Sequence, residues 1–292
     1  MQQPCAALLD DGSRLHLQHG PIDLIIGAEG ETPQARQTGF EAAHDRFRTL
    51  LDGLVTELGA HRSQLSQTTR KPCDPVAQRM YAGALPFCGS YFVTPMIAVA
   101  GSVADEVLKV MTDAAPLRRA YVNNGGDIAV HLQEDAQFSI AMAQTNGADL
   151  GRIRFGASEG IGGLATSGAK GRSHSFGIAD SVTVLARSAA QADAAATLIA
   201  NAVDLPKHPQ IQRMPANTLA PDSDLGTRSV VTFVPRLDPQ EAQTALARGQ
   251  AVAQRFLAEH HIIGCALFLQ GQAISLGGGF GQSLDNRERL HA

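Results

Sequence analysis

Apolar stretches of strand length follow one another along this chain with only short turns between them, and this spacing constrains the fold most. Residues 118–144 read RRAYVNNGGDIAVHLQEDAQFSIAMAQ, with apolar stretches on either side of NNGGD and of a polar turn. Asn-Gly and Gly-Gly are strong hairpin signals. Hairpins join antiparallel strands, whereas a doubly wound parallel sheet needs a helix after each strand. We therefore predict an α+β fold of mixed, mostly antiparallel sheets covered by helices.

Helical periodicity interrupts these strands at a few places. Apolar residues recur at three- and four-residue steps over residues 35–60, which predicts an amphipathic helix that covers a sheet face. A small-residue helix is expected to open with Thr94 as N-cap, and a further helix with Ser188 and Gln191 as a capping box. Residues 205–227, rich in Pro and Asn, predict a loop or a lid. With no internal repeat and no linker, we expect a single domain over residues 1–292.

The composition excludes several classes of protein. With 44% hydrophobic and 18% charged residues, the 292-residue chain is typical of globular proteins. A net charge of −4 without a long basic run argues against nucleic acid as a partner. No apolar run is long enough to span a bilayer and no signal peptide is evident, so we expect a cytoplasmic protein without a membrane partner. The four cysteines form no CxxC pair, which gives no zinc spacing.

The glycine-rich stretch IGGLATSGAKGRSHSFGIADS, residues 161–181, is the strongest candidate for a binding loop. Thr166, Ser167 and the amide of Gly168 could donate hydrogen bonds to an anion, most simply a phosphate, with Lys170 and Arg172 near enough to neutralise it. The lysine comes one place too late for a phosphate-binding P-loop, and a strand follows instead of a helix. The alternative is a plain Gly/Ser surface turn between two strands.

His174 follows this loop between two serines. An imidazole titrates near neutral pH and suits proton transfer, so His174 is a candidate catalytic residue. The alternative is a structural histidine.

Asp193 and Thr197 stand four residues apart in the predicted helix, so their side chains lie on one face. Together they can offer two oxygens to a hard cation such as Mg²⁺. The alternative is that Thr197 bonds its own backbone while Asp193 favours the positive end of the helix.

The turn NNGGD also has two interpretations. It is a plain hairpin turn, or its bare backbone and its Asn and Asp side chains grip a sugar or a base. The stretch MIAVAGSVAD, rich in small residues, leaves open whether it packs within the chain or across a homodimer.

Taken in order, VNNGGDIAV, ATSGAKGR, a histidine and SAAQADAAAT resemble the ApbE superfamily, whose best-known members are FAD:protein FMN transferases. The resemblance implies Mg²⁺ and FAD as cofactors. It implies metal ligation by Asp193 and Thr197 with a carbonyl near Val99, and a proton-accepting role for His174. The flavin contacts that it implies are Asn124, Gly125, Gly126, Asp127, Thr166, Ser167 and Gly168.

Two departures from the superfamily pattern keep the function open. Ala100 stands where the transferases have a lysine, and SFGIADS follows His174 where they have an I-D-P-x-T-G segment. One hypothesis is Mg²⁺-dependent FMN transfer from FAD to a threonine of an acceptor protein, or hydrolysis of the FAD pyrophosphate. The alternative is a fold repurposed to bind or act on another small phosphorylated or anionic metabolite, without FMN transfer.

Overall fold

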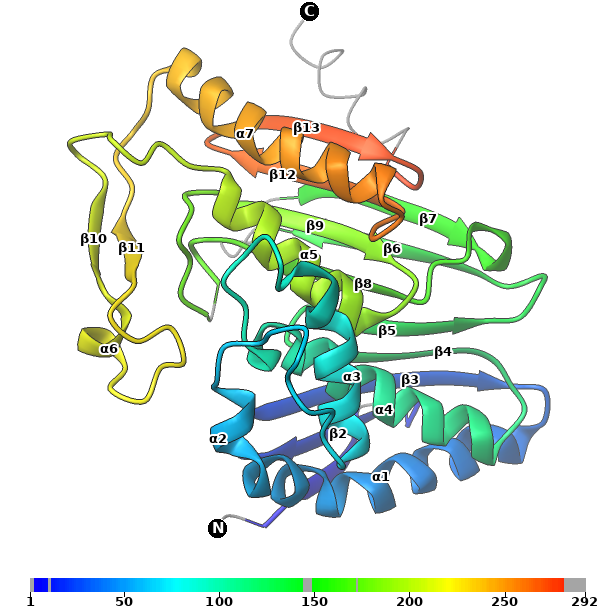
Figure 1. Ribbon diagram of the computed structural model, residues 1–292. Helices are drawn as coiled ribbons and strands as arrows, with labels where there is room; N and C mark the ends of the chain where they lie inside the picture. The colour runs from blue at the N-terminus through cyan, green and yellow to red at the C-terminus, as the bar shows by residue number, and fades with distance from the viewer. Residues whose placement is uncertain (1–2, 10–11, 144–148, 172, 281–292) are drawn as a thin grey trace, which may run out of the picture. The chain divides into compact units, whose positions relative to one another are not determined.

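We describe the fold from a computed structural model, in which residues 3–9, 12–143, 149–171 and 173–280 are described (Figure 1). The chain divides into two compact units. Unit 1 comprises Met1–Gln137, Gly156–Ala165 and Ala186–Ala194, and unit 2 comprises Phe138–Phe155, Thr166–Leu185 and Ala195–Ala292. The elements confirm the predicted α+β class with antiparallel pairing. The expectation of a single domain over residues 1–292 stays a prediction.

Unit 1 contains an antiparallel sheet with strands in the order β1-β2-β3-β4-β5-β8. The strands are β1 (Cys5–Leu9), β2 (Arg14–His19), β3 (Ile22–Gly30), β4 (Leu117–Asn124), β5 (Asp127–Leu132) and β8 (Gly163–Ser167). The helices are α1 (Pro33–Thr56), α2 (Leu58–His61), α3 (Pro75–Ala84), α4 (Val99–Ala114) and the first turns of α5 (Ala189–Ala202), with 3₁₀ turns η1 (Leu85–Phe87), η2 (Pro95–Ala98) and η3 (Ala157–Glu159).

The core of unit 1 lies between this sheet and α1 and α4, which pack against each other and against the central strands (Figure 1). Strand alternation buries every second residue, so that Leu24, Ile26 and Val122 face the helices. The predicted periodicity of α1 is confirmed, because Phe47 and Leu50 lie in this core. Burying each such side chain stabilises the fold by about 1.5–3 kcal/mol.

The expected helix at Thr94 begins differently from the prediction. The Thr94 side chain makes no capping hydrogen bond, and the chain first forms η2. Ala98, the last residue of this 3₁₀ turn, has φ −120° and ψ 15°, and α4 starts at Val99 without a side-chain cap of its own. The first amides of α4 therefore need acceptors from elsewhere in the chain.

Unit 2 consists of small antiparallel groups of strands and one long helix. It contains the pair β6-β7, the group β9-β12-β13 and the pair β10-β11. Helix α7 packs on β12 and β13. The strands are β6 (Gln137–Ala143), β7 (Asp149–Gly156), β9 (Ser181–Ala186), β10 (Gln212–Pro215), β11 (Ser229–Phe233), β12 (Gly264–Leu269) and β13 (Gln272–Gly277); the helices are the rest of α5, α6 (Ala216–Leu219) and α7 (Pro239–Ala258).

The prediction of a loop or a lid over residues 205–227 did not include any regular structure there. Strand β10 and helix α6 lie within it, and β10 pairs with β11 so that Met214 faces Val230. Arg213 anchors the strand, because its guanidinium donates to Asp204 Oδ1 at 2.6 Å and to the Phe176 carbonyl at 2.7 Å. Pro- and Asn-rich composition gave no sign of these long-range partners.

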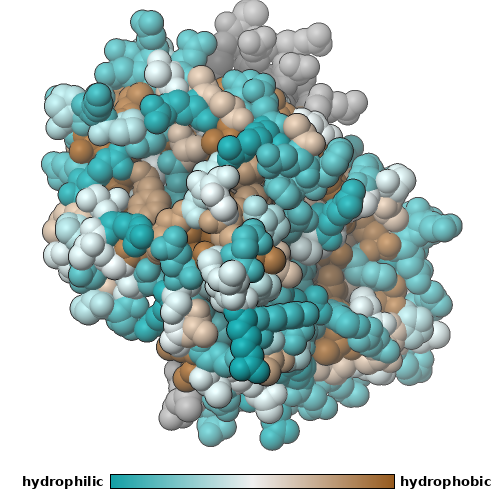
Figure 2. Space-filling view, in the orientation of Figure 1, coloured by the Kyte–Doolittle hydropathy of each residue, from teal (hydrophilic) through white to brown (hydrophobic). Residues whose placement is uncertain are grey.

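The surface seen in Figure 2 is mostly hydrophilic, with hydrophobic residues scattered among the polar ones. Among the described residues, no helix combines the length and the apolar character that crossing a bilayer requires.

Candidate functional site

The turn between β4 and β5 is the first part of the candidate site, and it lies in unit 1. Asn124 pairs with Asp127 across a two-residue turn in which Gly125 and Gly126 have φ of 67° and 113°. Positive φ at both positions explains the two glycines and confirms the hairpin prediction. The Asn123 side chain closes the turn by accepting from the Gly126 amide at 2.9 Å.

Asn124 connects this turn to the start of α4. Its side chain is buried, and its Nδ2 donates to the carbonyl of Ala100 at 3.1 Å. Ala100 is the residue at the lysine position of the transferases. The amide of Asn124 therefore holds the backbone of α4 at the point where the resemblance expects a cationic side chain.

Asp193 reaches the same point from α5. Its Oδ2 accepts from the Gly101 amide, in the first turn of α4, at 3.0 Å. Burial raises the pKa of Asp193 well above its ordinary value and the negative charge of Asp127 raises it further, while the amides of Gly101 and Ala100 oppose the shift. Burial and the charge of Asp127 therefore disfavour the ionised form of the Asp193 carboxyl.

No cationic side chain neutralises Asp193 among the described residues; backbone amides donate to it, and the negative charges of Asp127 and, to a smaller extent, Asp105 raise its pKa. An added cation would relieve the repulsion between the two carboxylates. The pair is thus suited to binding a positively charged species.

The other predicted binding residues belong to unit 2, where Thr197 and Ser167 contact each other. Thr197, on the turn of α5 after Asp193, has its hydroxyl 3.5 Å from Ser167 Oγ. The Thr166 hydroxyl lies 3.0 Å from that of Thr183 on β9. Thr197 therefore lies beside the T-S-G loop within this unit.

Gly168 is required by packing. A Cβ at this position would lie 2.6 Å from the Asp180 carbonyl, and the Gly168 carbonyl accepts from the Gly171 amide at 3.0 Å. This contact accounts for the glycine by close backbone approach and leaves its role toward an anion a prediction.

Lys170, which is expected to lie near enough to an anion to neutralise it, pairs with a carboxylate of this chain while its side chain stays 63% exposed, and its role toward an anion stays a prediction. Its Nζ lies 2.7 Å from Asp180 Oδ1, and the other Asp180 oxygen accepts from the Gln270 amide at 2.5 Å. Lys170 thus serves to balance a carboxylate that anchors β12. Arg172, the second predicted cation, lies outside the described residues.

His174 is partly exposed in the segment after the loop. The residues that follow it are tied to α5, because Asn201 Oδ1 accepts from the Phe176 amide at 2.9 Å and from Ser175 Oγ at 3.2 Å. Sequence reasoning missed Asn201, whose only signal was that it is one of the few polar residues of α5. The proton-transfer role of His174 stays a prediction.

The donors at Asp193 and Thr197 fit a hard cation in chemistry, because a carboxylate and a hydroxyl offer only oxygen. Within the described ranges no cluster of three or more His, Cys, Asp or Glu side chains could hold a metal ion. A cation here would take its remaining ligands from water and from ligand phosphates, which is how proteins commonly bind Mg²⁺.

Comparison with known proteins identifies the family. The family model described as "AbpE bacteria" matches residues 6–275, so the chain belongs to this family and is an ApbE-like protein. Among solved structures, the ApbE protein of Thermotoga maritima MSB8 is similar, at 13% identity and a TM-score of 0.49, over 89% of this chain and 96% of that one. No curated protein matches the chain.

Proposed function

We propose that this ApbE-like protein binds a flavin nucleotide, with Mg²⁺ held by Asp193 and Thr197. One observation carries the proposal: the Asp193 carboxyl accepts from the Gly101 amide, and no cationic side chain among the described residues neutralises it, while the negative charge of Asp127 raises its pKa. A ligand that brings a divalent cation would complete the charge balance.

The bare turn of Gly125 and Gly126 supports the same ligand class. Its backbone is free of side chains, and Asn124 and Asp127 flank it, so amides and carbonyls can approach a ring or a sugar closely. We propose that Thr166, Ser167, Gly168 and Arg172 supply further donors to the phosphates, as the resemblance implies.

The reaction that this ligand supports best is cleavage of the FAD pyrophosphate. Bound Mg²⁺ would neutralise charge on the two phosphates. A threonine hydroxyl of an acceptor protein forms a new O–P bond to the FMN phosphate, the P–O bond to AMP breaks, and His174 accepts the hydroxyl proton. With water in place of the threonine, the same groups release FMN and AMP.

A second candidate function has its own observation. Lys170 pairs with Asp180, and Ala100 stands where the resemblance places the lysine of the transferases, so one expected cation is absent and another is shared with a carboxylate of the chain. This favours binding of, or action on, another small anionic metabolite without FMN transfer.

The test is titration of the purified protein with FAD, FMN and ADP in turn, with and without Mg²⁺, followed by chromatography for AMP and FMN. The proposal expects FAD to bind more tightly with Mg²⁺ and AMP to appear. Asp193→Asn and Thr197→Val should lose the Mg²⁺ dependence, whereas Asp113→Asn, an exposed control on α4, should keep it. Mg²⁺-dependent binding without AMP would favour the second candidate, and absence of binding by all three would overturn both.

A further inference from the structure

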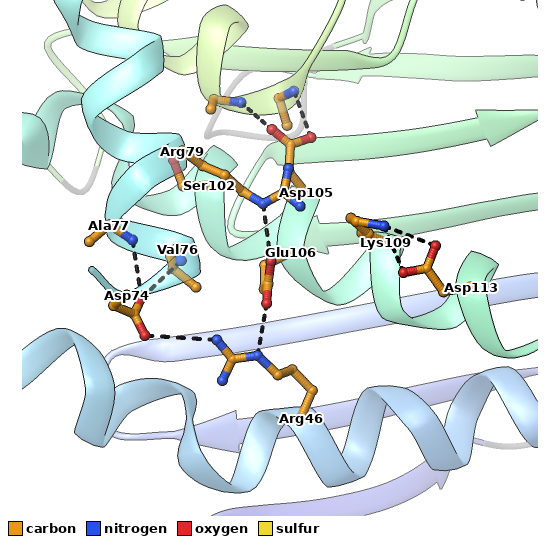
Figure 3. Close-up of polar contacts among 12 residues, drawn as sticks. Arg46, Asp74, Val76, Ala77, Arg79, Ser102, Asp105, Glu106, Lys109 and Asp113 are labelled. Carbon is orange, nitrogen blue, oxygen red and sulfur yellow. Dashed lines mark hydrogen bonds and ion pairs between the residues drawn. The ribbon is translucent and has the colours of Figure 1, made fainter. Parts of the chain in front are cut away.

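In unit 1, α4 and α5 each supply a carboxylate that accepts from the first backbone amides of the other helix. Asp105, on α4, accepts from the amides of Ala189 and Ala190 at 3.0 and 2.9 Å, in the first turn of α5 (Figure 3). Asp193, on α5, accepts from the amide of Gly101 in the first turn of α4. Each helix therefore supplies the acceptor that the other lacks.

This reciprocal capping needs the two backbones to approach closely, and glycines allow it. A Cβ on Gly101 would lie 2.2 Å from the Ala189 carbonyl, and one on Gly83 of α3 would lie 2.9 Å from the Ala190 carbonyl. A Cβ on Gly163 would likewise lie 2.2 Å from the amide nitrogen of Ala189. The start of α5 is thus packed against backbone of α3, α4 and β8.

Local capping alone does not account for the arrangement. Ser188 accepts from the Gln191 amide at 3.2 Å, so α5 has an N-cap of its own. Asp105, which lies on α4 and 84 residues before Ala189, accepts from two further amides of α5. Its contribution is to fix α5 relative to α4, which a local cap cannot do.

We propose that Asp105 is a positioning residue of the candidate site: by capping α5 it holds the Asp193 carboxylate at the first turn of α4, beside the Asn124–Asp127 turn. The inference rests on the proposed function for its metal, and on the two sets of hydrogen bonds for its geometry. An ionised carboxylate has about four acceptor positions, so Asp193 retains acceptor capacity beyond its amide bonds. Groups that orient a metal ligand in this way typically change metal affinity about 10- to 100-fold when removed.

The experiment measures Mg²⁺ affinity by calorimetry in the presence of FAD, and amide hydrogen exchange in the free protein. Asp105→Asn keeps one accepting oxygen and Asp105→Ala keeps none, so Mg²⁺ affinity should fall in that order, by about 10-fold or more for alanine. Exchange should speed up at Ala189 and Ala190, and also at Gly101, because the Asp193 bond loosens when α5 shifts.

Ser102→Ala is the matched control. Ser102 is buried near the start of α4 and donates to the Ala98 carbonyl at 2.6 Å, so Ser102→Ala removes a hydrogen bond at the start of α4 that does not reach α5. It should leave Mg²⁺ affinity within about twofold of wild type. An equal loss of affinity in Ser102→Ala and Asp105→Ala would overturn the positioning role.

The two proposals fail in different ways. If wild-type protein binds no Mg²⁺ with FAD, the proposed metal fails, and the exchange rates still decide the capping: unchanged rates at Gly101 in Asp105→Ala overturn it. If wild type binds Mg²⁺ and Asp193→Asn does not, but Asp105→Ala binds as wild type does, the proposed function stands and the positioning role is overturned.

Discussion

Glu106 and Asp193 are two acids of unit 1 with opposite surroundings. Glu106, which is 6% exposed, accepts from Arg46 Nε at 2.9 Å and from Arg79 Nε at 3.1 Å (Figure 3). Asp193 accepts from backbone amides, and the negative charges of Asp127 and Asp105 raise its pKa. The chain neutralises Glu106 from within, and the resulting ion pairs tie α1, α3 and α4 together.

The difference separates a structural acid from a candidate ligand-binding one. Removing one member of a buried ion pair leaves the other charge uncompensated, so Glu106 should be needed for stability. Removing the negative charge of Asp193 relieves its repulsion with Asp127, so its loss should have little effect on stability without ligand. We expect the Asp193 charge to matter for ligand binding instead.

The largest effect is therefore expected for Glu106→Gln. Loss of the carboxylate leaves Arg46 and Arg79 facing a neutral side chain and should lower the free energy of unfolding by about 3 kcal/mol. Asp193→Asn should change it by less than about 1 kcal/mol, because the amide oxygen can still accept from Gly101. Urea denaturation without Mg²⁺ measures both. A larger loss in Asp193→Asn than in Glu106→Gln would contradict the comparison.

Asp105, next to Glu106 on α4, is another acid of unit 1, and its contribution to stability should depend on pH. Burial raises the pKa of Asp105 from 3.8 to about 6, against the opposing effect of the Ala190 and Ala189 amides. The folded state therefore holds this proton more tightly than the unfolded state, and the Asp105 contribution to stability falls as pH rises from about 4 to 6. A shift of 3.8 to about 6 corresponds to up to about 3 kcal/mol.

Denaturation of wild type and of Asp105→Asn across pH 4 to 7 checks this expectation. Asp105→Asn lacks the titrating carboxyl, so its free energy of unfolding should not show this fall. The difference in free energy of unfolding between the two proteins should therefore change steadily as pH rises. A constant difference from pH 4 to 7 would mean that Asp105 titrates alike in both states.

The smallest effect is expected for a third acid of α4, Asp113. It pairs with Lys109 at 2.7 Å, but both side chains are more than half exposed (Figure 3). Asp113→Asn should therefore lower the free energy of unfolding by no more than about 0.5 kcal/mol, and salt should abolish the difference. If Asp113→Asn lowered the free energy of unfolding as much as Glu106→Gln does, burial would not explain the order of these effects.

Local features of the fold could be predicted from the sequence because they depend on neighbouring residues. The tight turn at Gly125 and Gly126 follows from the need for positive φ, and Ser188 caps α5 as its spacing to Gln191 suggested. The amphipathic helix α1 followed from its period alone.

The candidate site was predicted in part. Sequence order and resemblance selected Asp193 and the Asn124–Asp127 turn, but the partners that decide their chemistry are distant in sequence. The cap of α5 by Asp105 and the pairing of Lys170 with Asp180 depend on tertiary approach, for which no local pattern exists. The same reasoning explains why Thr94 was wrongly expected to cap a helix whose first amides are bound by Asp193.

The most direct test of the account is the effect of Mg²⁺ with FAD on thermal unfolding of wild type and Asp193→Asn. Ligands that bind only the folded state raise its apparent stability by mass action. The account predicts that Mg²⁺ adds to the stabilisation by FAD in wild type and adds nothing in Asp193→Asn. An equal increment from Mg²⁺ in both proteins would contradict it.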